Sequence, residues 1–287
     1  MTPANANRAA KPPPNDLGLL LRHWRDLRGV SQLDLSFNAG VSQRHISFIE
    51  SGRSVPSRQM LLDIAQTLDV PLRDRNALLL AAGYAPIYAD TAWNALEMQS
   101  VTKALERMLR QHEPFPALVM DRYWNVLMTN DAAPRFFNCF IDLAARKGPR
   151  NMLHLVFDPN GLRPFIADWQ SVSESLIQRV YRESVGRVID EPTRDLLAAL
   201  RAYPEVSTER SGIATPDADS AAMPVIPIGF VKDGHVLNYF SMVASVGTPL
   251  NVAAQELRIE CMFPADDETE ARHLEMLDAL LGKGKGE

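Results

Sequence analysis

Polar and basic side chains gather in one short stretch near the start of the chain, where their types suit contact with DNA bases. If this stretch is a helix, Gln43 and Arg44 lie on its first turn. A glutamine can pair with adenine N6 and N7, and an arginine with guanine O6 and N7, in the major groove. His45 and Ser47 offer further polar contacts, and Phe48 can touch a thymine methyl group. The stretch therefore predicts a helix that reads base sequence.

Three further residues suit the phosphate oxygens of a duplex. Gln32 and Ser42 are expected at helix N-termini, where side-chain and backbone donors favour anions. Arg53 lies just beyond the predicted reading helix and supplies a positive charge. We expect these residues to position the protein on the DNA backbone while the helix contacts the bases.

The spacing of apolar and small residues from Gln32 to Ile49 predicts the two helices that present these side chains. Four residues can fill one core, namely Leu35, Val41, Ile46 and Ile49. Ser36 is small enough for close helix contact, and Gly40 tolerates the left-handed backbone of a turn. This pattern is typical of a helix-turn-helix, whose second helix is free to enter a major groove. The alternative is that the polar side chains only solvate a surface helix.

The rest of the chain divides by its pattern into a small domain and a larger one. Residues 1–16 contain three consecutive prolines and are typical of a flexible arm. Apolar residues at spacings of three and four predict five short helices within residues 17–83. Residues 84–112 are expected to form a connector with a linking helix, followed by a second domain over residues 113–281 and a tail over residues 282–287.

The second domain mixes strands and helices. Strands are expected at residues 117–120, 124–129, 225–231, 236–246 and 257–263. Helices are expected after Asn130, at Trp169–Val180, at Leu196–Leu200 and at Leu274–Leu281. The predicted fold class is therefore multidomain, with an N-terminal all-α five-helix helix-turn-helix domain followed by an α+β domain that contains an antiparallel sheet.

Apolar side chains of the second domain are candidates to line a ligand cavity. They lie on elements expected to face the interior of the sheet, and they are Met120, Phe137, Trp169, Leu176, Phe240 and Met242. Aromatic and methionine side chains fill an ordinary core equally well, so they permit a pocket without requiring one.

Charge and composition exclude several classes of function. The net charge of −5 divides unevenly: residues 1–90 have ten Lys and Arg against eight Asp and Glu, and residues 91–287 have twenty against twenty-seven. The first domain therefore suits specific DNA binding better than binding driven by bulk charge. Apolar runs are far shorter than a membrane span, and two unpaired cysteines suit a reducing compartment, so we expect a soluble, cytoplasmic protein. Metal-ligand spacing, nucleophile motifs and phosphate loops are absent from the sequence, which predicts no metal, no cofactor and no enzyme.

Two stretches of the chain resemble the XRE family, the Cro and phage-repressor type of helix-turn-helix regulators: SQLDLSFNAGVSQRHISFIESGRSVPS and LDIAQTLDVPLRDRNALLLAAGYAP. Ser36 replaces the alanine common at that site but is still small. Later segments resemble the MmyB-like group within that family: RNMLHLVFDP, LRPFIADW and FPADDETEARHLEML. This resemblance covers nearly all of the chain after residue 16. It implies double-stranded DNA as a partner and a PAS-like C-terminal domain around a cavity for an apolar, fatty-acid-like ligand.

Three hypotheses of function follow. The leading one is a transcription regulator that binds DNA as a homodimer, on half-sites about one helical turn apart, and senses a small apolar molecule. In the second, the C-terminal domain serves only for dimerisation or protein contact. The third is a self-cleaving repressor cut at Ala82-Gly83, which needs a serine activated by a lysine such as Lys147 or Lys232.

Overall fold

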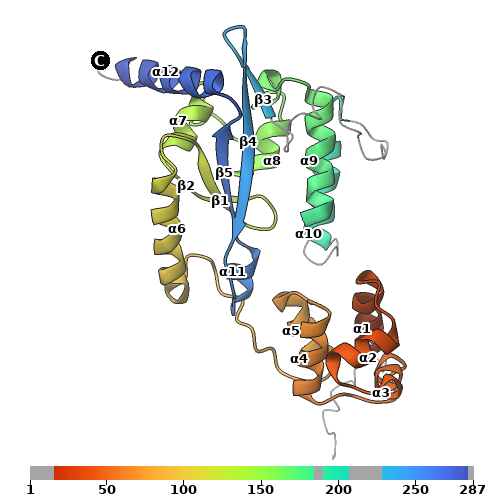
Figure 1. Ribbon diagram of the computed structural model, residues 1–287. Coiled ribbons are helices and arrows are strands. Elements are labelled where there is room, and N and C mark those ends of the chain that lie inside the picture. Colours follow the sequence, from red (N-terminus) through yellow and green to blue (C-terminus); the bar gives the residue numbers. More distant parts are fainter. Residues whose placement is uncertain (1–15, 184–189, 207–227, 284–287) are drawn as a thin grey trace, which may run out of the picture. The chain divides into compact units, whose positions relative to one another are not determined.

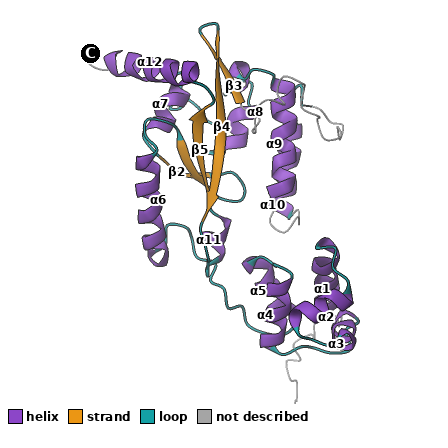
Figure 2. Ribbon diagram, in the orientation of Figure 1, coloured by secondary structure: helices purple, strands orange, loops and turns teal. Residues whose placement is uncertain are grey.

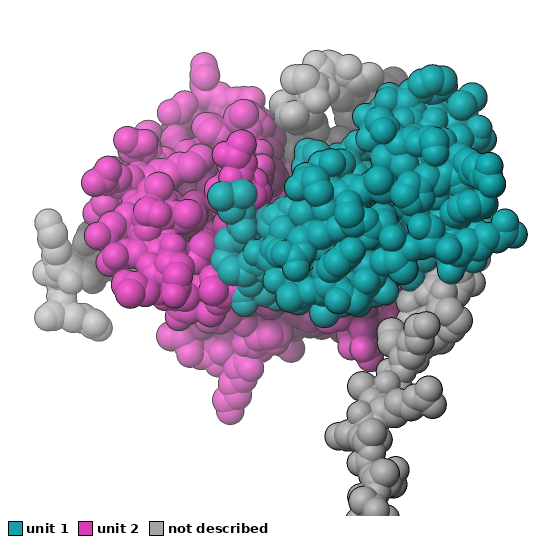
Figure 3. Space-filling model, turned by 90° about the horizontal axis from the view of Figure 1, so that it is seen from below, with its two compact units in different colours: residues 1–90, 250–252 teal, residues 91–249, 253–287 magenta. Residues whose placement is uncertain are grey.

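The computed structural model describes residues 16–183, 190–206 and 228–283. The chain forms two compact units, which Figure 3 colours separately: Met1–Asp90 with Leu250–Val252, and Thr91–Pro249 with Ala253–Glu287. Residues 1–15 of the predicted arm and residues 284–287 of the predicted tail lie outside the described residues. The two-domain fold class predicted from the sequence is confirmed.

The first unit consists of the five predicted helices (Figure 1). They are α1 (Asp16–Leu27), α2 (Gln32–Ala39), α3 (Gln43–Glu50), α4 (Arg58–Thr67) and α5 (Leu72–Ala81). Three of them begin at a serine whose hydroxyl accepts a backbone N–H of the first turn, namely Ser31, Ser42 and Ser57. Ser31 forms a full capping box with Asp34. Local chemistry therefore defines where these helices start.

The core of the first unit contains the predicted helix-turn-helix residues. Leu35, Ile46 and Ile49 are fully buried, and Val41 is buried beside them. Gly40 adopts the left-handed backbone that the turn requires, with φ 64°, and its N–H donates to Ser36 O. Burying one aliphatic side chain contributes about 1.5–3 kcal/mol, so this small core holds α2 and α3 together.

The contact between α1 and α3 depends on a residue without a side chain. A Cβ on Gly18 would lie 2.4 Å from the backbone oxygen of Glu50 and 2.9 Å from that of Ile49. The backbones of α1 and α3 therefore approach more closely here than any other residue type permits.

The second unit is built on a five-stranded antiparallel sheet with strand order β2-β1-β5-β4-β3 (Figure 2). The strands are β1 (Ala117–Met120), β2 (Val126–Thr129), β3 (Ile228–Lys232), β4 (His235–Ser245) and β5 (Arg258–Pro264). The β3–β4 turn contains Asp233 and Gly234, both with positive φ, as in two-residue hairpin turns. Residues 225–227 of the predicted third strand lie outside the described residues.

Helices cover both faces of this sheet. On one face pack α7 (Ala132–Asn138), α8 (Met152–Phe157), α9 (Trp169–Glu183) and α10 (Glu191–Arg201), around a core that includes Leu118, Phe136 and Tyr239. On the other face pack the short helix η1 (Leu96–Met98), α6 (Gln99–Gln111) and α11 (Val252–Glu256), against Val119 and Ile259. The last helix, α12 (Asp267–Lys283), contacts β4, β5 and α7.

The structure differs from the sequence-based expectation at the β1–β2 connection. Trp124 is predicted to begin a strand, but it has φ 66° and lies in a turn. The Asp121 carboxylate accepts the backbone N–H groups of Tyr123 and Asn125 at 2.8 and 2.9 Å, which closes the turn. The expectation was wrong because an aromatic residue favours strands in general, whereas an aspartate three residues earlier favours a turn here. The short helices α8, α11, η1 and η2 (Arg163–Phe165) were also not predicted.

The close approach of α1 and α3 is testable by adding one methyl group. Gly18→Ala should destabilise the first unit by about 1–3 kcal/mol, because a Cβ cannot fit against Glu50 O without moving a helix. Urea unfolding followed by circular dichroism measures this change. Leu19→Ala is the matched control, since the Leu19 side chain is 57% exposed and its loss should change stability little. Equal stability of Gly18→Ala and the wild type would contradict the close contact.

Candidate nucleic-acid interface and ligand cavity

One side of α3 presents polar groups while the other side fills the core of the first unit. Gln43 and Arg44 are exposed, and Ser47 and Phe48 are half-buried. Ile46 and Ile49 are fully buried on the opposite side. With about 100° per residue, Gln43, Arg44, Ser47 and Phe48 share one face. The predicted base-reading residues are thus together on a helix whose back is fixed by packing.

Phe48 holds two arginines beside its ring. The guanidinium carbon of Arg44 lies 5.2 Å from the ring centre, and that of Arg53 lies 5.6 Å from it. Gly52, with φ 72°, turns the chain after α3, and the Arg53 N–H donates to Phe48 O at 2.8 Å. Neither arginine has a carboxylate partner among the residues that the structure describes. Two positive charges without a described carboxylate partner therefore lie beside the Phe48 ring.

The remaining predicted DNA contacts are partly committed to internal hydrogen bonds. Ser42 caps α3, accepting the His45 N–H at 3.2 Å. The His45 ring lies at the edge of the reading face, with Nε2 3.3 Å from Ser54 Oγ. Gln32, the first residue of α2, donates from Nε2 to Glu50 Oε2 at 2.9 Å. One amide proton of Gln32 and the hydroxyl proton of Ser42 are still available for a phosphate, so both stay predicted contacts.

Glu50 connects three helices through a buried carboxylate. Its side chain is 1% exposed, and it accepts hydrogen bonds from Arg25 at 2.7 and 3.2 Å, in addition to the one from Gln32. Burial alone would raise the pKa of Glu50, but the hydrogen bonds from Arg25 and Gln32 outweigh it, and the pKa is lowered. Glu50 therefore stays charged and ties α3 to both α1 and α2. The sequence analysis did not identify this interaction.

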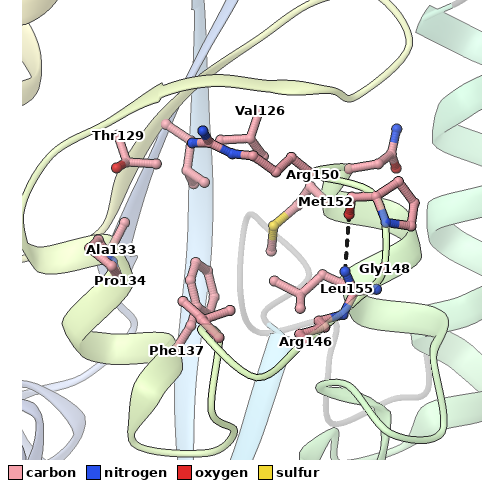
Figure 4. A pocket seen from close by; sticks show the side chains of 14 residues that line it. Val126, Thr129, Ala133, Pro134, Phe137, Arg146, Gly148, Arg150, Met152 and Leu155 are labelled. Atoms are coloured by element: carbon pink, nitrogen blue, oxygen red, sulfur yellow. Dashed lines mark hydrogen bonds between the residues drawn. The ribbon is translucent and has the colours of Figure 1, made fainter.

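The second unit contains a cavity of about 250 Å³ between the sheet and helices α7 and α8 (Figure 4). Leu118, Val126 and Thr129 line it from the sheet, while Phe137 and Leu155 line it from the helices. The other lining residues are Ala133, Pro134, Leu143, Arg146, Gly148, Pro149, Arg150, Asn151 and Met152. Figure 4 shows the thioether of Met152 pointing into the middle of the cavity. Among the residues that the structure describes, no Asp or Glu lines it.

Arg146 is the buried polar group of this cavity. Its side chain is 12% exposed, and it donates to Pro149 O at 3.0 Å and to His154 O at 3.2 Å, with Asp158 Oδ2 3.4 Å away. Its Nε is buried and has no hydrogen-bond partner in the described part of the chain. A buried donor without an acceptor is costly, on the order of 1–3 kcal/mol. The cavity therefore combines apolar walls with a guanidinium that is ion-paired with Asp158 and keeps one N–H, at Nε, without an acceptor among the described residues.

Of the predicted cavity residues, only Phe137 lines the cavity. Met120 and Leu176 are buried in the core on the same face of the sheet. Trp169 packs edge-on against Phe157 at 5.1 Å and borders a separate, open hollow with Arg163 and prolines. These three residues adjoin the same core but not the cavity itself.

The expected placement of Phe240 and Met242 was wrong. The Phe240 ring stacks on Phe263 at 5.5 Å, on the face of the sheet that α6 covers, and Met242 is 60% exposed. Both residues alternate with Tyr239, which faces the cavity side. When both faces of a strand carry apolar residues, the sequence pattern does not tell which face meets a cavity.

Sequence reasoning missed the loop that supplies most of the cavity's polar atoms. Residues 146–151 read as an ordinary surface loop of Gly, Pro and charged residues. The available signal was Asn151, which caps α8 by accepting the N–H groups of Leu153 and His154. A cap at Asn151 predicts that a short apolar helix begins there. Because Arg146 and Arg150 come just before it, their positive charges are expected beside the core that this helix joins.

Comparison with known families gives the same division of the chain. A helix-turn-helix family model matches residues 21–74. The model of the MmyB-like transcription regulator ligand binding domain matches residues 101–276, more than half of the chain. The chain belongs to the MmyB-like transcription regulators. A search of the curated proteins found no match.

This membership assigns a general function to each unit of this MmyB-like regulator. It is a DNA-binding transcription regulator with a ligand-binding domain. Both matched families are regulator domains, not enzymes. Among the helices that the structure describes, none is long and apolar enough to cross a bilayer. In the same part of the chain, no three His, Cys, Asp or Glu side chains are grouped to hold a metal ion.

The Glu50 interaction predicts a pH-dependent stability of the first unit. Because the folded pKa of Glu50 is lowered, its contribution is present above the unfolded pKa near 4.3 and is lost as the pH falls through the folded value. Glu50→Ala should destabilise the unit at pH 7 by about 3 kcal/mol or more, since Arg25 loses its buried partner. The variant should also lose less stability than the wild type as the pH falls. Peptide-resolved hydrogen exchange of α1–α3 measures both effects.

Asp63→Ala is the control for Glu50→Ala, because Asp63 is an exposed carboxylate of the same unit. It should leave the exchange rates of α1–α3 nearly unchanged. If Glu50→Ala behaves like Asp63→Ala at pH 7, the carboxylate does not hold the helices together.

Proposed function

We propose that this regulator reads its operator with the exposed face of α3 and responds to a fatty-acid-like effector in the cavity beside α8. Gln43 and Arg44 are the principal base readers, assisted by Ser47, Phe48 and His45. Gln32, Ser42 and Arg53 contact phosphates. The protein acts as a homodimer on two half-sites, and its ligand-binding unit has PAS-like architecture.

The observation that carries the DNA-reading proposal is the free surface of α3. Its core side is fully buried, its end is tied by Glu50, and its outer face has two arginines without an acidic partner among the described residues. A helix held rigidly from behind can place side chains on base edges with little loss of conformational entropy. A merely solvated surface helix would not need this support.

The fatty-acid-like nature of the effector is supported by the cavity's chemistry. Apolar side chains make up most of its wall, and Arg146 offers an unpaired buried donor. An anionic head on an apolar chain satisfies both features, because a carboxylate accepts hydrogen bonds from arginine and the chain replaces water on the walls. The volume of about 250 Å³ lies just below the range of drug-sized ligand sites, which favours a slender molecule.

The PAS-like architecture and the homodimer are proposals of the same kind. An antiparallel sheet with helices around an apolar cavity is the arrangement that the family resemblance implies. Dimerisation is proposed because a helix-turn-helix unit of this type binds two half-sites as a two-fold dimer. Light scattering of the purified chain at several concentrations measures the oligomeric state directly.

The DNA-reading proposal predicts different effects for two arginines. Arg44→Ala should weaken operator binding by about 1–3 kcal/mol and relax the preference at one base position. Arg53→Ala should weaken binding to every sequence similarly. It should also reduce the slope of log affinity against log salt concentration by about 1. Fluorescence anisotropy with duplexes from the upstream region of its own gene, and with shuffled duplexes, measures both.

Gln66→Ala is the control in this experiment, since Gln66 is exposed on α4 and outside the reading face. Its binding should equal that of the wild type. Unchanged affinity and preference of Arg44→Ala would show that another surface reads the bases.

The effector proposal predicts that head-group recognition depends on Arg146. Decanoate should bind the full chain more tightly than decanol, and Arg146→Met should weaken decanoate binding about tenfold or more without changing decanol. Thr129→Trp, at an exposed position of the cavity wall, should weaken both ligands by filling the space. Isothermal titration calorimetry measures these affinities.

Arg135→Met is the matched control, because Arg135 is exposed on α7 and does not line the cavity. If neither ligand binds the wild type, and solvent extraction of the purified protein releases no lipid, the second unit is better explained as a dimerisation or protein-contact module.

A further inference from the structure

The Arg44–Phe48–Arg53 cluster of the first unit has a geometry that two independent base readers would not need. The Arg44 and Arg53 guanidinium groups lie 5.2 and 5.6 Å from the same ring centre. Arg44 and Phe48 are four residues apart on α3, so their side chains meet on one face of the helix. Arg53 is returned to the ring by the Gly52 turn and by its hydrogen bond to Phe48 O.

The cluster places two positive charges beside one aromatic ring, and none of the described residues pairs a carboxylate with either of them. The ring's negative face attracts each guanidinium and limits its motion. The nearest buried carboxylate, Glu50, is committed to Arg25 and Gln32. The two guanidinium groups are therefore preorganised to donate hydrogen bonds to a molecule outside the protein. Phe48 is the residue that positions both arginines.

The stack also couples two contacts with bases. Arg44 can bind guanine through O6 and N7, and an aromatic ring contacts the C5 methyl group of thymine. Successive base pairs are about 3.4 Å apart along the helix axis, so a guanidinium and a ring whose centres are 5.2 Å apart cannot serve distant pairs. They reach neighbouring base pairs, and Arg53 then lies at the phosphates beside them.

We propose that Arg44 and Phe48 read one base-pair step as a unit, namely a guanine directly beside a thymine whose methyl group meets the Phe48 ring. Phe48 is both the methyl sensor and the positioning residue for Arg44. This inference rests on the proposed reading face of α3 and adds the identity of a step that the operator half-site must contain. Part of the signal is the C5 methyl group of thymine, which can be removed from the DNA without changing the rest of the base.

The first experiment finds the sequence that the protein selects. Full-length protein is used to enrich duplexes from a random-sequence library, as the wild type and as the variants Phe48→Leu, Phe48→Tyr and Arg44→Lys. The wild type should enrich a motif with guanine next to thymine. Phe48→Tyr should keep this step, because it keeps the ring. Phe48→Leu should keep the thymine but weaken the guanine preference about two- to fivefold, since the stack on Arg44 is lost. Arg44→Lys should lose the guanine preference, because lysine lacks the two-pronged geometry.

The second experiment removes only the methyl group. In the enriched duplex, deoxyuridine replaces the thymine of the proposed step, which should weaken wild-type binding about fourfold, the value of one buried methyl-sized group. Replacing that A·T pair with G·5-methylcytosine should bind more tightly than replacing it with G·C. Deoxyuridine at a thymine outside the motif should have no effect. Gln66→Ala should show the same deoxyuridine effect as the wild type.

The outcomes separate this inference from the proposed function. If the wild type enriches no motif and binds no duplex specifically, the reading face itself is wrong. If it enriches a motif and binds tightly, but deoxyuridine changes nothing or Phe48→Leu keeps the full guanine preference, the coupled step is overturned while DNA reading by α3 stands. Circular dichroism of each variant verifies that the fold is intact before binding is compared.

Discussion

The buried carboxylate of Glu50 is the interaction on which the DNA-reading unit depends. It lies at the last residue of α3 and accepts hydrogen bonds from α1 through Arg25 and from α2 through Gln32. Hydrophobic packing is not directional, so the small core alone would allow α3 to slide or rotate. A charged group with fixed hydrogen-bond directions removes this freedom. The absence of a side chain at Gly18 serves the same contact, because it lets α1 come close enough for Arg25 to reach Glu50.

The second unit is organised by a different constraint, since its sheet must be covered on both faces. Helices fill most of this requirement, but between α7 and α8 the chain runs as the loop that contains Arg146 and Arg150. A loop packs less densely than a helix, and the cavity lies where the loop replaces one. Asn151 fixes the end of the loop by donating to Tyr123 O at 2.7 Å and by capping α8. The wall of the cavity is thus rigid on the α8 side, and Arg146 is held there with its Nε unused.

The first unit was largely predictable from sequence because its signals are local. Serine caps, the Gly40 turn and the spacing of Leu35, Ile46 and Ile49 each lie within a few residues of the structure that they specify. The Glu50 interaction joins residues up to 25 positions apart, and no local pattern reveals it. The cavity failed to follow from sequence for the same reason. Arg146 lines the cavity and Phe240 does not. This difference follows from the path of the loop and from the strand register, which depend on the whole sheet.

Charge explains why a mildly basic unit suffices for DNA recognition. Most of the described arginines of the first unit serve the fold: Arg25 binds Glu50, Arg28 binds Leu68 O, and Arg73 binds Asp90. Arg44 and Arg53 have no such carboxylate partner in that part of the chain. Each neutralised phosphate changes the slope of log affinity against log salt concentration by about 0.9. Arg44 and Arg53 alone therefore give one copy only a weak electrostatic attraction. Affinity must then come from correctly placed base contacts, and these exist only while α3 is held by the core and by Glu50. The same argument explains why the acidic balance of the second unit is tolerable, because recognition that depends on correctly placed base contacts depends little on the net charge of the chain at physiological salt.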